Sequence, residues 1–160
     1  MSTDLAPTRS VTHGTFTVER TIKAPPARVF RAFADLEQKK RWFNGPPEWD
    51  PDVHEAFEFR PGGRESSHGG PKGGTVHRFE ARYHDIIENE RIVYTYEMYL
   101  DAARISVSAV SIEFRPHPAG THLVCTEHGI HLDGHDTVEG REEGTRWIFD
   151  NMAQVVEAGD

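Results

Sequence analysis

The residues best suited to chemistry lie near the end of the chain's strand-rich part, where an acid and a thiol alternate with an apolar side chain. Leu123, Cys125 and Glu127 are spaced two residues apart, which on an extended strand places all three on one face. A carboxylate on a face turned away from water must be paired or hydrogen-bonded, or its pKa rises. Glu127 could therefore bind a ligand amine or hydroxyl, or act as a general base. It could equally reach solvent, or pair with an arginine such as Arg82 or Arg141.

Aromatic and methionine side chains alternate in the same way on two preceding segments. The alternating positions are Phe79, Ala81, Tyr83 and Ile87 in one segment and Ile92, Tyr94, Tyr96 and Met98 in the next. Closed cores are packed best by Leu, Ile and Val, whereas tyrosine hydroxyls suit a cavity that holds something other than protein. We therefore expect a cavity, although the rings could also fill the space by packing on one another. The residues expected to bind a ligand are Trp42, Phe43, Trp49, Phe57, Phe59, Phe79, Tyr83, Tyr94, Tyr96, Met98, Leu123, Glu127, Ile148 and Met152.

A histidine-rich segment near the end of the strands raises the question of a metal site. His128, His131 and His135 are close in sequence, with Asp133 and Asp136 beside them. Side chains three residues apart on an extended segment point to opposite faces. The spacing also differs from the helical zinc-protease pattern. We predict no metal site.

Nucleophilic and nucleotide chemistry is not indicated either. Cys125 is the single cysteine, and burial among apolar residues raises a thiol pKa and makes it inert. His122 and His128 are an odd number of residues away, so they are expected on the other face of the strand. The glycine-rich segment 69–74 lacks the Gly-Lys-Ser/Thr ending of a phosphate-binding loop. We predict no cofactor and leave open whether the protein is an enzyme.

Composition limits the classes of partner. The 160 residues carry a net charge of -8, which disfavours binding to nucleic acid or to an anionic membrane surface. The densest basic run, residues 39–41, is expected to be a solvated helix face. A single cysteine allows no intrachain disulfide, and no apolar run reaches membrane-spanning length, so we expect a cytoplasmic protein. The length fits one domain, residues 14–158, after a disordered segment, residues 1–13.

Period-2 and helical patterns predict the elements that position these residues. A strand at 15–24 is followed by helices at 26–34 and 36–43, where Pro25 and Pro26 mark the first helix start. Six strands follow, at 53–60, 64–68, 75–87, 91–100, 104–115 and 121–130. The alternation in the fifth of them changes face near Ala109, which predicts a bulge. A closing helix at 138–157 completes the order β-α-α-β6-α, an α+β arrangement of an antiparallel sheet around a long C-terminal helix.

Several motifs carry a resemblance to a known family. Residues 18–25 with Val29-Phe30, residues 59–64, and residues 83–96 around Glu90-Arg91-Ile92-Val93-Tyr94 occur in the family's order and spacing. Residues 120–123, 126–129, 132–134 and 141–144 resemble one bacterial subgroup. The chain is similar to the START-like, helix-grip (Bet v 1-like) superfamily, in the branch related to the C-terminal domain of the activator of the Hsp90 ATPase. The resemblance implies a curved sheet gripping the last helix, with a ligand cavity between them.

Three functions follow as hypotheses. The first is binding of a small hydrophobic or amphipathic molecule, lipid-like, aromatic or polyketide-like. The second is an enzyme of the cyclase or hydrolase type that uses Glu127 or a tyrosine of the cavity as acid or base. The third is a protein-interaction module, either like an Hsp90 co-chaperone or a homodimer, in which Trp42, Phe43 and Trp49 form a contact patch.

Overall fold

The computed structural model describes residues 9–159, which form one antiparallel sheet and three helices. The elements are β1 (Val11–Ile22), α1 (Pro26–Ala34), α2 (Leu36–Lys39), β2 (Asp50–Phe57), β3 (Arg64–Gly70), β4 (His77–Ile87), β5 (Arg91–Leu100), β6 (Ala103–His117), β7 (Gly120–Leu132) and α3 (Val138–Glu157). The strands lie in the order β1-β7-β6-β5-β4-β3-β2. The predicted α+β class and the order β-α-α-β6-α are confirmed.

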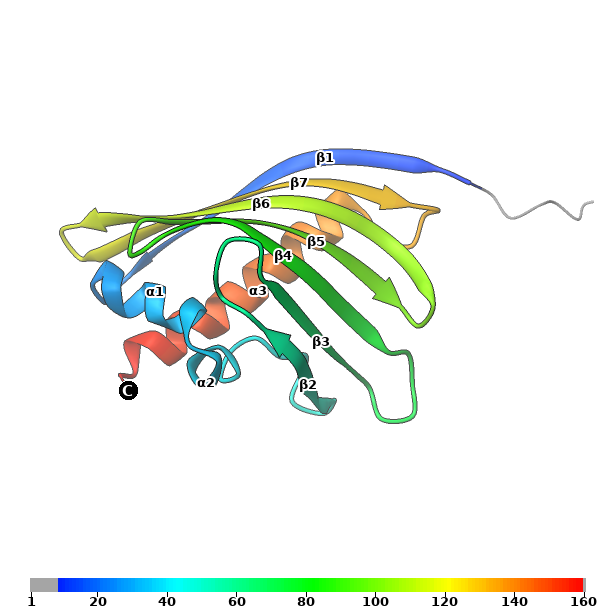
Figure 1. Ribbon diagram of the computed structural model, residues 1–160, viewed down its shortest axis with the longest axis horizontal. Helices are drawn as coiled ribbons and strands as arrows, with labels where there is room; N and C mark the ends of the chain where they lie inside the picture. Colours follow the sequence, from blue (N-terminus) through cyan, green and yellow to red (C-terminus); the bar gives the residue numbers. More distant parts are fainter. Residues whose placement is uncertain (1–8, 160) are drawn as a thin grey trace, which may run out of the picture.

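The sheet arches over α3, and α1 and α2 cover one end of its concave side (Figure 1). Register shifts interrupt the ladders between Tyr83 and Asp85 on β4, and at Ile105 on β6 opposite β5. Such bulges increase the local twist and bend a strand. The resulting curvature lets the concave face surround the last helix, as the helix-grip prediction required.

Local sequence explains where the helices begin. Pro26 opens α1, where a missing N–H costs no hydrogen bond. The Asp35 side chain accepts from the Glu37 backbone N–H at the start of α2, and Thr137 accepts from Gly140 at the start of α3. α2 ends at Lys39, four residues before the predicted end at 43. None of the helices among residues 9–159 is long and apolar enough to cross a membrane.

The core fills only the end of the concave side that α1 covers. There the ring of Phe33 meets Trp42 at 4.9 Å, Phe114 at 5.4 Å and Phe149 at 6.0 Å, all edge to face. Met152 is fully buried on the same side of α3. The first half of α3 faces the sheet across a cavity.

The strands differ from expectation at the bulge and at several of their ends. The bulge in β6 lies at Ile105, between the pairs Met98–Ser106 and Tyr99–Arg104, and not at Ala109. Alternation is unbroken from Ser106 to Phe114, but the inner positions at its start are serines, which concealed the pattern. β1 begins at Val11, so residues 11–13 of the segment expected to be disordered belong to a strand. Residues 1–8 of that segment lie outside the described part of the chain.

Candidate functional site

A cavity of about 360 Å³ lies between the concave face of the sheet and the first half of α3. Known small-molecule sites are of about 300–1,000 Å³. Its walls come from the loop after α2, from the inner faces of β3, β4, β5 and β7, and from α3. Eight of the residues predicted from the sequence line it: Phe43, Trp49, Phe79, Tyr94, Tyr96, Met98, Glu127 and Ile148.

The other six predicted residues lie outside this cavity: Trp42, Phe57, Phe59, Tyr83, Leu123 and Met152. Leu123 and Met152 are fully buried in the core. Trp42 is also buried, and its Nε1 donates to the Ala32 carbonyl at 2.9 Å. Trp42 therefore cannot belong to the exposed contact patch that the interaction hypothesis placed there, because only 2% of it is accessible.

Glu127 forms the polar end of the cavity. It is 3% exposed, and its Oε2 accepts a hydrogen bond from the Tyr96 hydroxyl at 2.7 Å. Arg141 Nη1 lies 3.7 Å from the same oxygen, whereas Arg82 bonds the Gly62 carbonyl elsewhere. Of the alternatives left open by the sequence, the buried side chain paired with Arg141 is the one observed. Burial raises the pKa of Glu127, while the Tyr96 hydrogen bond and the Arg141 charge oppose that rise.

Arg141 holds this end of the cavity together from the first turns of α3. Its Nε donates to Asp136 at 3.1 Å, Nη1 to the Tyr96 hydroxyl at 2.8 Å, and Nη2 to Ser106 at 2.8 Å. The guanidinium thus joins α3 to β5 and β6 and to the loop before α3. The Tyr96 hydroxyl accepts from Arg141 and donates to Glu127, which fixes the direction of both bonds. Burial and the neighbouring Glu127 carboxylate raise the pKa of Tyr96, so it stays protonated.

A second buried polar cluster lies beside the cavity and was not predicted. Lys39 Nζ contacts Glu65 Oε1 at 2.7 Å, and the Tyr83 hydroxyl donates to the same oxygen. Lys39 is only 6% exposed and lies 4.6 Å from the centroid of the Phe43 ring. The expected solvated helix face is therefore wrong for Lys39, because α2 turns this side chain toward the sheet. Through Phe43 the cluster adjoins the cavity wall.

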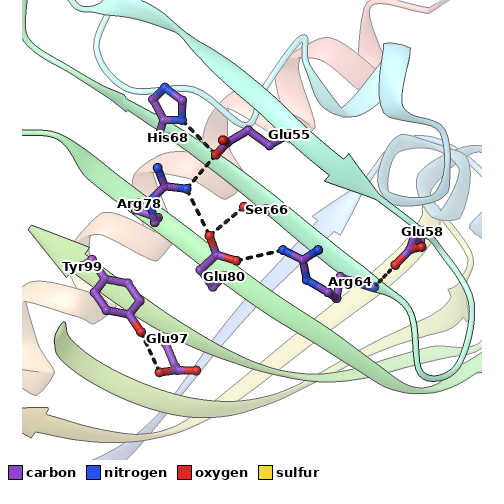
Figure 2. A network of polar contacts seen from close by, with 9 residues as sticks. All are labelled: Glu55, Glu58, Arg64, Ser66, His68, Arg78, Glu80, Glu97 and Tyr99. Carbon is purple, nitrogen blue, oxygen red and sulfur yellow. Dashed lines mark hydrogen bonds and ion pairs between the residues drawn. The ribbon is translucent and has the colours of Figure 1, made fainter. Parts of the chain in front are cut away.

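The outer face of β2, β3 and β4 is polar and solvated (Figure 2). Arg78 Nη1 lies 2.6 Å from Glu55 and 3.2 Å from Glu80, and Arg64 reaches Glu80 at 3.5 Å. Exposed ion pairs of this kind add little stability. They keep the convex side soluble while the alternate residues of β3 and β4 line the cavity. The candidate site is therefore confined to the concave side.

Comparison with known proteins places the chain in a family. Residues 23–157 match the family described as activator of Hsp90 ATPase homolog 1-like protein. The chain belongs to this family. The predicted resemblance to the Hsp90-activator branch of the START-like superfamily is thus confirmed. None of the curated proteins matches the chain.

Solved structures of bacterial proteins share the fold of this family member. An uncharacterized protein from Rhizobium leguminosarum is 40% identical, with a TM-score of 0.88 over 94% of this chain and 99% of the other. A protein from Rhizobium loti is also 40% identical, with a TM-score of 0.81 over 91% and 99% of the two chains. A protein from Aeromonas hydrophila, named as being of the same family, has 20% identity and a TM-score of 0.67 over 91% and 93%. At that identity it shows the fold alone.

Several residues that line the cavity were not predicted from the sequence to do so: Asp52, Ser67, His77, Arg141, Gly144 and Thr145. Of these, Arg141 was named only as a possible partner of Glu127. For α3 a signal was present, because Arg141, Gly144, Thr145 and Ile148 have the i, i+3, i+4, i+7 spacing of one helix face. That stripe is polar and small at its start, so an apolar periodicity does not reveal it.

Cys125 lines the cavity but has the character predicted for it. The side chain is buried, and burial raises the pKa of its thiol. His128 lies on the opposite, outer face, as predicted, where its Nδ1 is 2.8 Å from the Thr15 hydroxyl. Within residues 9–159 no three His, Cys, Asp or Glu side chains are grouped closely enough to hold a metal ion.

Proposed function

We propose that this protein binds a small hydrophobic or amphipathic ligand, of lipid-like, aromatic or polyketide-like character, in the cavity between the sheet and α3. The observation that carries the proposal is the arrangement of the cavity walls. Phe43, Phe79, Met98 and Ile148 supply apolar surface, and Glu127 meets its polar partners at one end. An apolar pocket with a few convergent polar groups is the usual form of a small-molecule site.

Affinity would come mainly from the apolar walls, at about 25 cal/mol for each Å² removed from water. The polar end would fix the orientation of the ligand, because Glu127 and Tyr96 are already held in place by Arg141. A pre-organised site loses little entropy when the ligand binds. The cytoplasmic location expected from the sequence stays part of this proposal.

Gly144 offers a way to block the cavity without disturbing its walls. It lies on α3 and lines the cavity, and a Cβ built there meets no atom within 4 Å. Gly144→Leu should occupy part of the space and weaken binding, whereas Gly144→Ala should leave more room and stabilise the helix. Both variants and the wild type are screened by thermal shift and native mass spectrometry against lipid-like, aromatic and polyketide-like compounds. Absence of any bound or stabilising compound for the wild type, or equal binding by Gly144→Leu, would contradict the proposal.

Acid–base catalysis at Glu127 is a second candidate, favoured by its raised pKa inside a cavity. Glu127→Gln should then abolish turnover of a bound compound while apolar binding persists. Unchanged turnover in that variant would exclude the catalytic role.

The Hsp90-related and homodimer hypotheses are tested separately, by Hsp90 ATPase assays and by sedimentation over a range of concentrations.

A further inference from the structure

The polar end of the cavity discriminates between ligand head groups. We propose that it accepts ligands whose polar group donates a hydrogen bond, a hydroxyl or an ammonium, and rejects carboxylates of the same shape. This inference rests on the proposed function, since it specifies the chemistry of the ligand in that cavity. An arginine in a pocket would ordinarily suggest the opposite preference, because guanidinium pairs well with carboxylate.

Arg141 is already engaged by groups of the protein through three of its five N–H donors. Its Nε, Nη1 and Nη2 atoms all have partners within the protein, namely Asp136, Tyr96 and Ser106. Glu127 lies 3.7 Å from Nη1 and Asp136 3.1 Å from Nε, so two carboxylates already surround this one cation. A ligand carboxylate would therefore lose its hydration to meet a guanidinium whose charge Glu127 and Asp136 already compensate.

The remaining ionisable groups of the cavity wall add to the same preference. Asp52 is the other acid that lines it, and Arg141 is the one arginine or lysine on the wall among the described residues. His77 also lines the cavity, and burial lowers its pKa, which favours the neutral imidazole. A ligand carboxylate brought close to the Glu127 carboxylate is therefore repelled, whereas an ammonium is attracted. Asp52 adds to this repulsion only when it is ionised, because burial raises its pKa.

Glu127 provides the acceptor for such a donor. A carboxylate can accept about four hydrogen bonds, of which the Tyr96 hydroxyl supplies one and the nearby Ser108 hydroxyl can supply a second. Glu127 lines the cavity, so the acceptor capacity that is left is available to a ligand. A hydrogen bond from a ligand hydroxyl or ammonium to this carboxylate is of the strong, charge-assisted kind.

The test uses four naphthalenes that share one ring system and differ in one substituent: naphthol, naphthylmethylamine, naphthoic acid and methylnaphthalene. Each is titrated into the wild type by calorimetry at mildly alkaline pH, where the amine is a cation and the acid an anion. Naphthol and naphthylmethylamine should each bind about tenfold or more tighter than naphthoate. Methylnaphthalene should bind more weakly than the two donors and more tightly than naphthoate. Naphthoate binding as tightly as the two donors would overturn the inference and leave the proposed function standing. Failure of all four to bind would count against both.

Glu127→Gln separates the head-group effect from the apolar contribution. It should weaken naphthylmethylamine about tenfold, tighten naphthoate, and leave methylnaphthalene within about twofold. Glu113→Gln is the matched control, because Glu113 lies on the outer face of β6 and pairs with Arg115 at 2.8 Å. All four affinities should be unchanged in the control. If Glu127→Gln also loses methylnaphthalene, the cavity itself has changed, and the wild-type ranking decides the matter alone.

Discussion

Glu127 sits between two opposing influences on its charge. Burial disfavours the carboxylate, while the Tyr96 hydroxyl and Arg141 favour it, and burial is the larger effect, so the pKa lies above its ordinary value of 4.5. A carboxyl with a raised pKa contributes stability below 4.5, and this is lost as the pH rises through its folded-state pKa. The same balance leaves a carboxylate available to a ligand once the group has ionised.

This balance predicts the pH dependence of folding. Glutamine is neutral at every pH, so the unfolding free energy of the wild type should fall relative to Glu127→Gln as the pH rises above about 4.5. The difference amounts to about 1.4 kcal/mol for each unit by which the pKa is raised. Urea denaturation of both proteins over a pH series measures it, and groups shared by both proteins cancel. A wild type that gained stability relative to the variant would show that the Arg141 pair outweighs burial.

The sequence predicts which face of the sheet Glu127 occupies. Counting by twos places Cys125 and Glu127 on the concave face, as observed. It cannot choose between Arg141 and Arg82 as the partner of Glu127. That choice depends on where the start of α3 crosses the sheet, which brings together residues 14 positions apart and is not encoded in any local pattern.

The short helix α2 is fixed to the sheet by a buried ion pair. Glu65 on β3 is fully buried and receives Lys39 from α2 and the Tyr83 hydroxyl from β4. Both hydrogen bonds go to Oε1. The pair therefore links three elements at the point where Phe43 enters the cavity wall.

Lys39→Met tests this link. Removing one partner of a buried pair leaves an uncompensated charge, so the unfolding free energy should fall by about 3–5 kcal/mol. Lys40→Met is the matched control, because Lys40 is half-exposed and lies 3.6 Å from Glu37. The control should cost less than about 1 kcal/mol. Urea denaturation compares the two, and equal losses would mean that Lys39 is held no more firmly than a surface lysine.

Elements with clear periodicity were predicted well, and those without it were not. The bounds of α1, β5 and α3 agree with the sequence expectation to the residue. β3 begins with Arg64-Glu65-Ser66-Ser67, in which no apolar alternation marks Glu65 as an inner residue. Lys39 lies in a run of three basic residues whose composition is that of an exposed helix. Lys39 and Glu65 are 26 positions apart, so only the tertiary structure reveals that they form a buried pair.

The whole molecule divides the concave side into a filled end and a hollow end. Leu123 and Met152 were expected in the cavity because they share faces with residues that do line it. They lie instead where α1 and its phenylalanines close the space. Alternation identifies which face is covered, but the volume left beneath depends on how α1, α2 and α3 divide that face. This is why eight of the fourteen predicted residues line the cavity.

The division predicts which segments respond to a ligand. Saturation with naphthol should slow amide hydrogen exchange in residues 43–49, in 67–79 and in the first half of α3, since these segments surround the cavity. Residues 11–22 of β1 and the filled end around α1 should change little, because they do not line it. Exchange is measured by mass spectrometry with and without naphthol, and the Gly144→Leu variant, as the control, should show weaker protection. Protection centred on residues 11–22 or on α1, with none in residues 43–49 or in the first half of α3, would place the ligand outside the cavity. That result would contradict the concave site.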